Sequence, residues 1–157
     1  MKIEIYYLAA GAEEFAAAAA EAAALFGLSS GGVLAAGDIA AVLPADAVLI
    51  SNELPAAAKT TVITTVHYWR EPGVLGSRSE RETTAEAGPA AVRRLVQLNL
   101  RKLLGRLTGR DPGPWGILRG VRPAKIIHRL LDEGLPPAAV IDRFMTDYAV
   151  TADKARL

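Results

Sequence analysis

Four cations have the residue types and spacing most suggestive of chemistry: Arg119, Arg122, Lys125 and Arg129. The last three share one face of a helix, because residues three or four apart on a helix are neighbours. Arg122 and Lys125 also lie at or near the start of that helix, where the helix dipole already carries positive charge. This arrangement predicts a site for an anion or for docking of an acidic surface. The open alternative is structural: Arg122 and Lys125 form ion pairs with acids such as Asp132, Glu133 or Asp142, or cap carbonyls of a neighbouring helix.

The helix that positions these cations has clear start and stop signals. Pro123 suits the first helical position, where its missing N–H costs nothing. Gly134 is placed to end the helix in a left-handed conformation. Between them an apolar stripe recurs at helical spacing, formed by Ile126, Ile127, Leu130 and Leu131.

Other residues with chemical potential have simpler explanations. His67 stands beside Tyr68 and Trp69 in a strand-like segment, and we expect an aromatic cluster on a strand face rather than a catalytic base. Trp69 and Trp115 are expected to pack in the core, although Trp115 followed by Gly116 could also form a wall for a flat ligand. His128 is expected to flank the core of its helix as a neutral ring.

Several chemical classes are excluded by the sequence. It contains no phosphate-binding loop, no GxGxxG after a strand, no HExxH and no GxSxG. It also contains no cysteine, which excludes disulfides, thiolate metal sites and iron–sulfur ligation within the chain. We therefore predict no catalytic residue, no metal site and no cofactor held by this chain alone.

Charge is distributed unevenly along the 157 residues, although the net charge is only +1. Residues 1–58 contain one basic and seven acidic residues, whereas residues 89–129 contain ten basic residues and one acidic residue. This asymmetry indicates either an anionic partner or a solvated basic face balanced by the acidic N-terminal half. No apolar run is long enough to cross a membrane, and no signal peptide is recognisable, so we expect a cytoplasmic protein.

The N-terminal part alternates strand-like and helix-like segments. Predicted strands are Lys2–Leu8, Ile39–Leu43, Ala47–Ser51, and a hairpin of Lys59–Arg70 with Val74–Thr84. A helix is predicted over Ala12–Phe26, and Gly31-Gly32 marks a loop. A second helix begins at Pro89 and runs to about Leu107, with its arginines on the flank away from the apolar stripe: Arg93, Arg94 and Arg101.

The C-terminal part is helical. Residues 109–114 form a Gly/Pro-rich linker, and a helix follows Pro136-Pro137. Thr151 is a predicted N-cap for a last helix, Ala152–Leu157, so the chain has the pattern of a truncated one. Together the elements predict an α+β fold: a small, mostly antiparallel sheet with helices on one face, followed by a C-terminal helical subdomain. The predicted domains are 1–108 and 109–157.

The segment Pro-Trp-Gly-Ile-Leu-x-Gly-Val-Arg-Pro-x-Lys-Ile-Ile-His, from Pro114 to His128, also resembles a known family. It is similar to the Trp-Gly-Ile-Leu-Thr-Gly-Ile/Val-Arg-Pro-Thr-Lys segment of the HemZ family, the coproporphyrinogen dehydrogenase-like branch of the radical S-adenosylmethionine enzymes. The similarity extends weakly to Pro89 and to Leu157. Arg119 and Ala124 stand where the family pattern has Thr. The motif residues without an assigned role are Trp115, Gly116, Gly120 and Pro123.

The resemblance implies that this chain is the N-terminal part of an enzyme that decarboxylates coproporphyrinogen propionates oxidatively in haem biosynthesis. The complete enzyme would use a 4Fe-4S cluster and S-adenosylmethionine, held by a downstream catalytic region with a Cys-x-x-x-Cys-x-x-Cys motif. The partners implied are that downstream region and an anionic tetrapyrrole. A second hypothesis is a basic RNA-binding accessory module, because small sheets with helices and a basic strip also bind nucleic acid.

Overall fold

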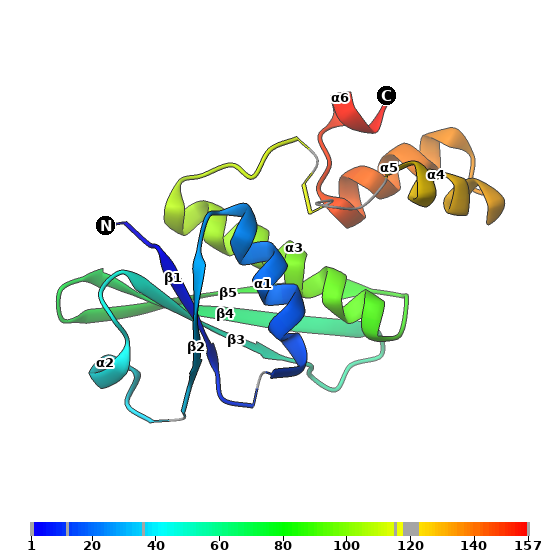
Figure 1. Cartoon of the computed structure of the whole chain (residues 1–157). Helices are drawn as coiled ribbons and strands as arrows, with labels where there is room; N and C mark the ends of the chain where they lie inside the picture. The colour runs from blue at the N-terminus through cyan, green and yellow to red at the C-terminus, as the bar shows by residue number, and fades with distance from the viewer. Residues whose placement is uncertain (1, 12, 36, 115, 118–122, 157) are drawn as a thin grey trace. The chain divides into compact units, whose positions relative to one another are not determined.

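The computed structural model describes residues 2–11, 13–35, 37–114, 116–117 and 123–156 (Figure 1). Its backbone contacts divide the chain into two compact units, Met1–Asp111 and Pro112–Leu157. We call them the N-terminal unit and the C-terminal unit and describe each by itself. The α+β class predicted from the sequence is confirmed, since a sheet packed against helices is followed by further helices.

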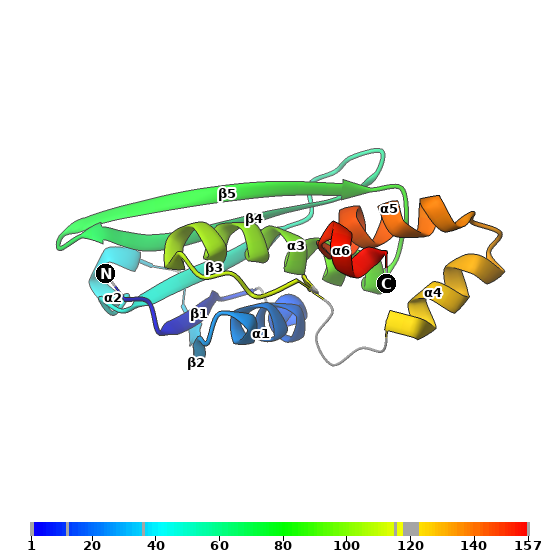
Figure 2. The same ribbon diagram turned by 90° about the horizontal axis from the view of Figure 1, so that it is seen from above.

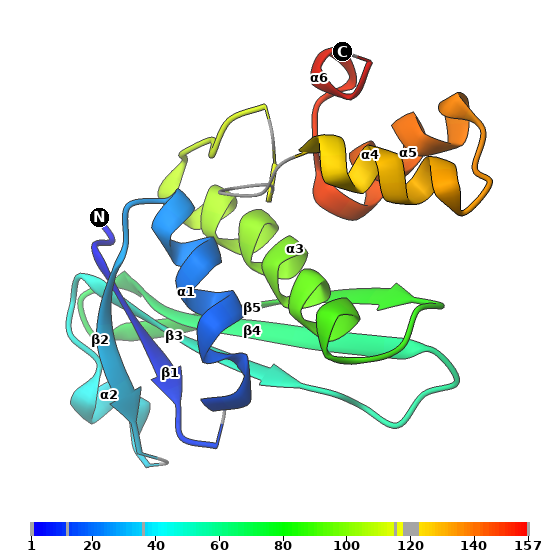
Figure 3. The same cartoon turned by 45° about the vertical axis from the view of Figure 1, so that its right-hand side comes forward.

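The N-terminal unit is built on a five-stranded mixed sheet with the order β2-β1-β3-β4-β5 (Figure 3). The strands are β1 (Ile5–Ala9), β2 (Ser29–Leu34), β3 (Ala47–Glu53), β4 (Thr60–Glu71) and β5 (Val74–Thr84). Strand β1 lies between β2 and β3 and pairs in parallel with both. The longer pairings, β3 with β4 and β4 with β5, are antiparallel, as the predicted hairpin required.

Two helices cover the same face of this sheet, α1 (Ala16–Leu25) and α3 (Pro89–Thr108) (Figure 2). A single 3-10 turn, Glu13–Phe15, leads into α1. The sheet presents alternate residues to the helices, because side chains along a strand point to opposite faces. Val48, Val62 and Val66 are fully buried on this face, as are Leu100 and Leu103 on α3.

For two segments of the N-terminal unit the predicted secondary structure is wrong. The run Ile39–Leu43, predicted as a strand, forms the short helix α2 (Ile39–Val42). The Asp38 carboxylate accepts a hydrogen bond from the backbone N–H of Ala40 at 3.1 Å, and this cap satisfies the first turn of the helix. Ile39 packs against the sheet face that α1 and α3 leave free, together with Leu43 and Leu49.

Gly31 and Gly32, predicted as a loop, lie within strand β2. The pairing of β2 with β1 shifts register between Tyr6 and Tyr7, opposite these glycines. A Cβ atom on Gly31 would lie closer than 3.0 Å to the Tyr7 ring. The glycine is therefore explained by the close approach of an aromatic side chain in a sheet, rather than by a turn.

The C-terminal unit consists of α4 (Pro123–Asp132), α5 (Pro137–Tyr148) and α6 (Ala152–Ala155). Its core is one cluster of buried apolar residues: Ile126, Leu130, Val140, Phe144 and Val150. Gly134 follows α4 with φ +89°, as its predicted role in ending the helix requires. Thr151 is the N-cap residue of α6, as predicted, although its side chain makes no capping hydrogen bond.

Candidate functional site

The described part of the family-like segment is anchored to the turn between α5 and α6. The backbone N–H of Ile117 donates to the carbonyl of Tyr148 at 2.9 Å, and that of Thr151 donates to the carbonyl of Pro114 at 2.8 Å. Gly116 has φ +61°, and a Cβ there would overlap the backbone of Tyr148 and Ala149. Gly116 is therefore required on two grounds: its left-handed backbone and this close packing.

The predicted cationic site is described only in part. Trp115, Arg119, Gly120 and Arg122 lie outside the described residues, so their predicted roles stay predictions. Pro123 begins α4, as expected for its position in the sequence. Lys125 and Arg129 project from α4 and are exposed.

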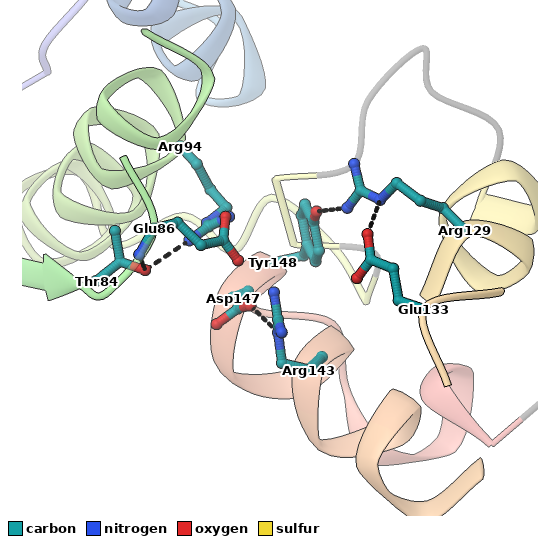
Figure 4. Close-up of polar contacts among 8 residues, drawn as sticks. All are labelled: Thr84, Glu86, Arg94, Arg129, Glu133, Arg143, Asp147 and Tyr148. Atoms are coloured by element: carbon teal, nitrogen blue, oxygen red, sulfur yellow. Dashed lines mark hydrogen bonds and ion pairs between the residues drawn. The ribbon is translucent and has the colours of Figure 1, made fainter. Parts of the chain in front are cut away.

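The two described cations of this site differ in their contacts, and Figure 4 shows those of Arg129. Arg129 lies 3.9 Å from the Glu133 carboxylate and donates a hydrogen bond to the Tyr148 hydroxyl at 3.3 Å. Both partners of the ion pair are more than half exposed, so the pair stabilises α4 by well under about 1 kcal/mol. Lys125 makes no hydrogen bond or ion pair with the residues that the structure describes. Among the described residues, therefore, Lys125 forms none of the ion pairs of the structural alternative, and the ion pair that is formed joins Glu133 to Arg129. For Arg122, which lies outside the described residues, that alternative stays a prediction.

The basic residues of α3 are largely neutralised within the N-terminal unit. Arg93 pairs with Glu21 on α1, Lys102 with Glu82 at 2.5 Å, and Arg106 with Glu80 at 2.5 Å. Arg94 pairs with Glu86 at 2.9 Å and also bonds the Thr84 hydroxyl (Figure 4). Arg94, predicted on the flank of α3 away from its apolar stripe, has a side chain that is only 10% exposed.

A cavity of about 760 Å³ opens in the N-terminal unit beside residues that follow the carboxyl ends of β1 and β3. Ligands in sheets with parallel strands often bind at the carboxyl ends, where neighbouring connections leave in opposite directions. The walls are mostly apolar, with Phe15 and Ala18 from one side and Val92 from the start of α3. Lys59 lines it too, and its side-chain ammonium group has no hydrogen-bond or ion-pair partner among the described residues. The sequence analysis missed this cavity, because only the strand order brings segments 14–18, 54–61 and 88–93 together.

The aromatic segment of β4 is split between the two faces of the sheet. Tyr68 is buried on the face covered by α1 and α3, whereas His67 and Trp69 lie on the other face. Burial lowers the pKa of His67 below its ordinary value. Its cross-strand neighbours are Leu49 and Ser77, neither of which is charged. No described residue hydrogen-bonds the His67 ring, so it lacks the partner that would orient a general base.

The described residues contain neither a membrane-spanning helix nor a cluster of potential metal ligands. None of the helices there combines the length and apolar character that a bilayer crossing needs. Among the same residues, no three His, Asp or Glu side chains gather in a group able to hold a metal ion. Compared with protein-family models, curated proteins and solved structures, the chain matches none of them.

Proposed function

We propose that this chain is the N-terminal accessory region of a radical S-adenosylmethionine, coproporphyrinogen dehydrogenase-like enzyme, and that its C-terminal unit docks the catalytic region. The observation that carries the proposal is the run from Pro114 to His128, with its resemblance to the HemZ family. The chain has no cysteine, so the residues present do not fit a 4Fe-4S cluster. Cluster and S-adenosylmethionine would be held by the catalytic region, and this chain would supply no catalytic residue.

The geometry of α4 supports a docking role. Within the described part of the motif, the Gly116 segment is held against the α5–α6 turn, and one side of α4 is exposed. Lys125 and Arg129 lie on that side, and Leu131 on the same helix is 43% exposed. Exposed cations on one side of a helix are typical of a surface that meets a partner with acidic groups.

The RNA-binding alternative receives less support. Nucleic-acid affinity depends on cations free to contact phosphates. Four basic residues of α3 already pair with carboxylates of the N-terminal unit: Arg93, Arg94, Lys102 and Arg106. The basic segment 89–129 is therefore less available to a phosphate backbone than its composition indicates.

The first test is to read the gene downstream of codon 157. The proposal predicts an in-frame Cys-x-x-x-Cys-x-x-Cys sequence within a few dozen codons. A stop codon at that point, or a methyltransferase-like strand with a Gly-rich loop, would overturn the proposal.

The second test is binding of the separately expressed catalytic region, measured by calorimetry. Lys125→Gln and Arg129→Gln should each weaken binding by about fivefold or more, as expected for loss of a charge-assisted contact. Arg156→Gln is the matched control, since Arg156 is also exposed in this unit but follows α6. The melting temperature should stay unchanged in all three variants. Equal weakening by the control, or no weakening by either test variant, would contradict docking through α4.

The third test addresses the anionic tetrapyrrole. Coproporphyrin III carries four carboxylates, and its Soret band reports a change of environment. Binding that is lost in Lys125→Gln would assign the tetrapyrrole to the same surface. Binding that Lys125→Gln leaves intact would separate substrate binding from docking.

A further inference from the structure

The cavity of about 760 Å³ in the N-terminal unit is formed by segments that follow three strands of the same direction. Strand β1 is parallel to β3, and β4 is antiparallel to both β3 and β5, so β1, β3 and β5 end at the same end of the sheet. Figure 3 shows that α1 and α3 also begin there. Segments 14–18, 54–59 and 88–93 therefore meet, although each follows a different strand.

The position and the size of this cavity are those of a ligand site. Small molecules bind at the carboxyl ends of parallel strands where the chain leaves neighbouring strands in opposite directions. Here the chain leaves β1 toward β2 and leaves β3 toward β4, on opposite sides of the β1–β3 pair. The volume lies within the range of about 300–1,000 Å³ that is typical of sites for small organic ligands.

The walls of the cavity are mostly apolar. Phe15 is 4% exposed and Ala18 is 3% exposed, so this part of the wall belongs to the packed core of the unit. Leu54 also lines the cavity and is 45% exposed. An apolar ligand group that contacts Leu54 removes apolar surface of both partners from water, which favours binding.

Two opposite charges line the cavity without neutralising each other. The Lys59 ammonium group and the Glu14 carboxylate are both exposed, and neither has a hydrogen-bond or ion-pair partner among the described residues. The other charged residue of the lining, Arg93, already pairs with Glu21 of α1. Within the described part of the unit, the cavity therefore presents one unpaired cation and one unpaired anion beside an apolar wall.

Hydrogen bonds hold the backbone from which the Lys59 side chain projects. The Thr61 hydroxyl donates to the Lys59 carbonyl at 3.1 Å and lies 3.1 Å from the Thr83 hydroxyl of β5. Thr61 is only 3% exposed, so this contact is formed inside the unit. Glu14 lies in the 3-10 turn that leads into α1. Both charges are therefore carried by backbone with defined hydrogen bonding, on opposite sides of the chain's path around the cavity.

We infer that this cavity binds a small zwitterion with an apolar body, as a free apolar amino acid or a short apolar peptide supplies. The ligand carboxylate pairs with Lys59, its ammonium group pairs with Glu14, and its apolar side chain contacts Leu54. A zwitterion answers both charges, whereas a simple anion would be repelled by the Glu14 carboxylate. This site belongs to the N-terminal unit and does not rest on the proposed docking function of the C-terminal unit.

The test is an NMR titration of the full chain with L-leucine and with L-leucyl-L-leucine, which separate the amino acid from the peptide. We expect saturable shifts of backbone amides in residues 54–61 and 88–93 with at least one of them. Glycylglycine keeps both charges without an apolar side chain and should bind at least about fivefold more weakly than the leucine ligand. Shifts centred elsewhere, or no saturation up to about 10 mM, would overturn the proposal.

Blocked forms of the ligand that binds test the two charges. The N-acetylated form lacks the ammonium group, and the C-terminal amide lacks the carboxylate. Each should bind at least about fivefold more weakly than the zwitterion, because each loses a charge-assisted contact. Unchanged binding of either blocked form would show that the site does not recognise a zwitterion.

Variants then assign the contacts. Lys59→Gln and Glu14→Gln should each weaken binding of the zwitterion at least about fivefold. Lys2→Gln and Glu4→Gln are the matched controls, since they change the same residue types at the amino end of β1, away from the cavity. The controls should leave the affinity unchanged within about twofold. Equal weakening by test and control variants would mean general charge attraction and would contradict the site.

Variants and blocked ligands together exclude an indirect effect on the fold. Glu14→Gln should not weaken binding of the N-acetylated form further, because that form lacks the group that Glu14 contacts. Lys59→Gln should likewise not weaken binding of the amide further. Losses of the same size for free and blocked ligands would contradict the assigned contacts. If either variant loses its dispersed spectrum, Leu54→Ala tests the exposed part of the wall: several-fold weaker binding supports the site, and unchanged binding contradicts it.

Discussion

At the scale of single residues, the clearest structural role within the family-like motif belongs to Gly116. Its φ of +61° and its contact with the backbone of Tyr148 and Ala149 both exclude a side chain. The motif glycine is thus explained by the packing of a loop against a helix end. Ala149, which contacts Gly116, also has a left-handed backbone conformation, with φ +57°, although it is not a glycine. It is the residue that caps the C-terminal end of α5.

Gly116→Ala should lower the free energy of unfolding of the C-terminal unit by about 2–4 kcal/mol, through backbone strain and steric overlap. Denaturation followed by helical circular dichroism measures the change. Gly134→Ala is the control, since Gly134 also has a positive φ but open space around its Cβ position. It should cost only about 1 kcal/mol. Equal costs for the two variants would remove the packing argument and leave only backbone strain.

His67 should make stability depend on pH. Burial lowers its folded-state pKa, so the native state binds fewer protons than the unfolded state as the pH falls through the unfolded value of about 6.5. The free energy of unfolding is therefore highest above that pH and decreases below it, until the folded pKa is reached. His67→Gln should make the free energy of unfolding depend less steeply on pH, as measured by urea denaturation between pH 7.5 and pH 5.5. His128→Gln, at an exposed histidine, should retain the pH dependence of the wild type. Identical slopes in wild type and His67→Gln would contradict the assignment.

At the scale of elements, α3 is held to the hairpin by charge as well as by apolar packing. Its inner side buries Leu95, Val96 and Leu103, while Lys102 and Arg106 reach the acids of β5. The register of β5 places Glu80 and Glu82 on the face toward α3, because residues two apart on a strand share a face. Composition alone cannot distinguish such pairs from a free basic strip.

The pair of Lys102 with Glu82 can be tested by exchanging the charges. Lys102→Glu should lower the free energy of unfolding of the N-terminal unit by about 0.5–1 kcal/mol, since both side chains are partly exposed and solvent screens the pair. Adding Glu82→Lys should restore most of that loss, and the coupling should decrease at high salt. Urea denaturation of the two single variants and the double variant gives the coupling energy. A double variant as unstable as the sum of the singles would show that the pair contributes nothing.

At the scale of the whole molecule, each of the two compact units has a core of its own. The N-terminal unit has its core between the sheet and its two long helices, and the C-terminal unit has its own cluster around Leu130 and Phe144. Separate cores predict separate cooperative unfolding, because each unit can open without exposing the core of the other.

Hydrogen exchange measured by mass spectrometry should show these two cooperative units. We expect slower exchange in β4 and α3 than in α4 to α6, whose core is small. In Gly116→Ala, exchange should accelerate across residues 123–156 and stay unchanged in α3. Acceleration of the same size in α3 would mean that the chain unfolds as one cooperative body.

The sequence by itself determined the elements that depend on local signals. Periodicity and turn residues located β4, β5, α3 and α4 closely, because alternation, Pro at a helix start and Gly at a helix end act within a few residues. The same local signals misassigned β2 and α2, where a Tyr7 ring over Gly31 and an Asp38 cap decide the outcome. The absence of cysteine also excluded an internal iron–sulfur site without any structure.

Only the tertiary structure decided which charged and aromatic side chains meet. Arg93 and Glu21 are far apart in the sequence and become partners when α1 packs beside α3. The cavity lined by Glu14 and Lys59 depends on three strands that run in the same direction, and strand direction leaves no periodic signal in the sequence. Pairing across a fold follows from long-range packing, so composition could count the cations of this chain but could not tell which of them have partners.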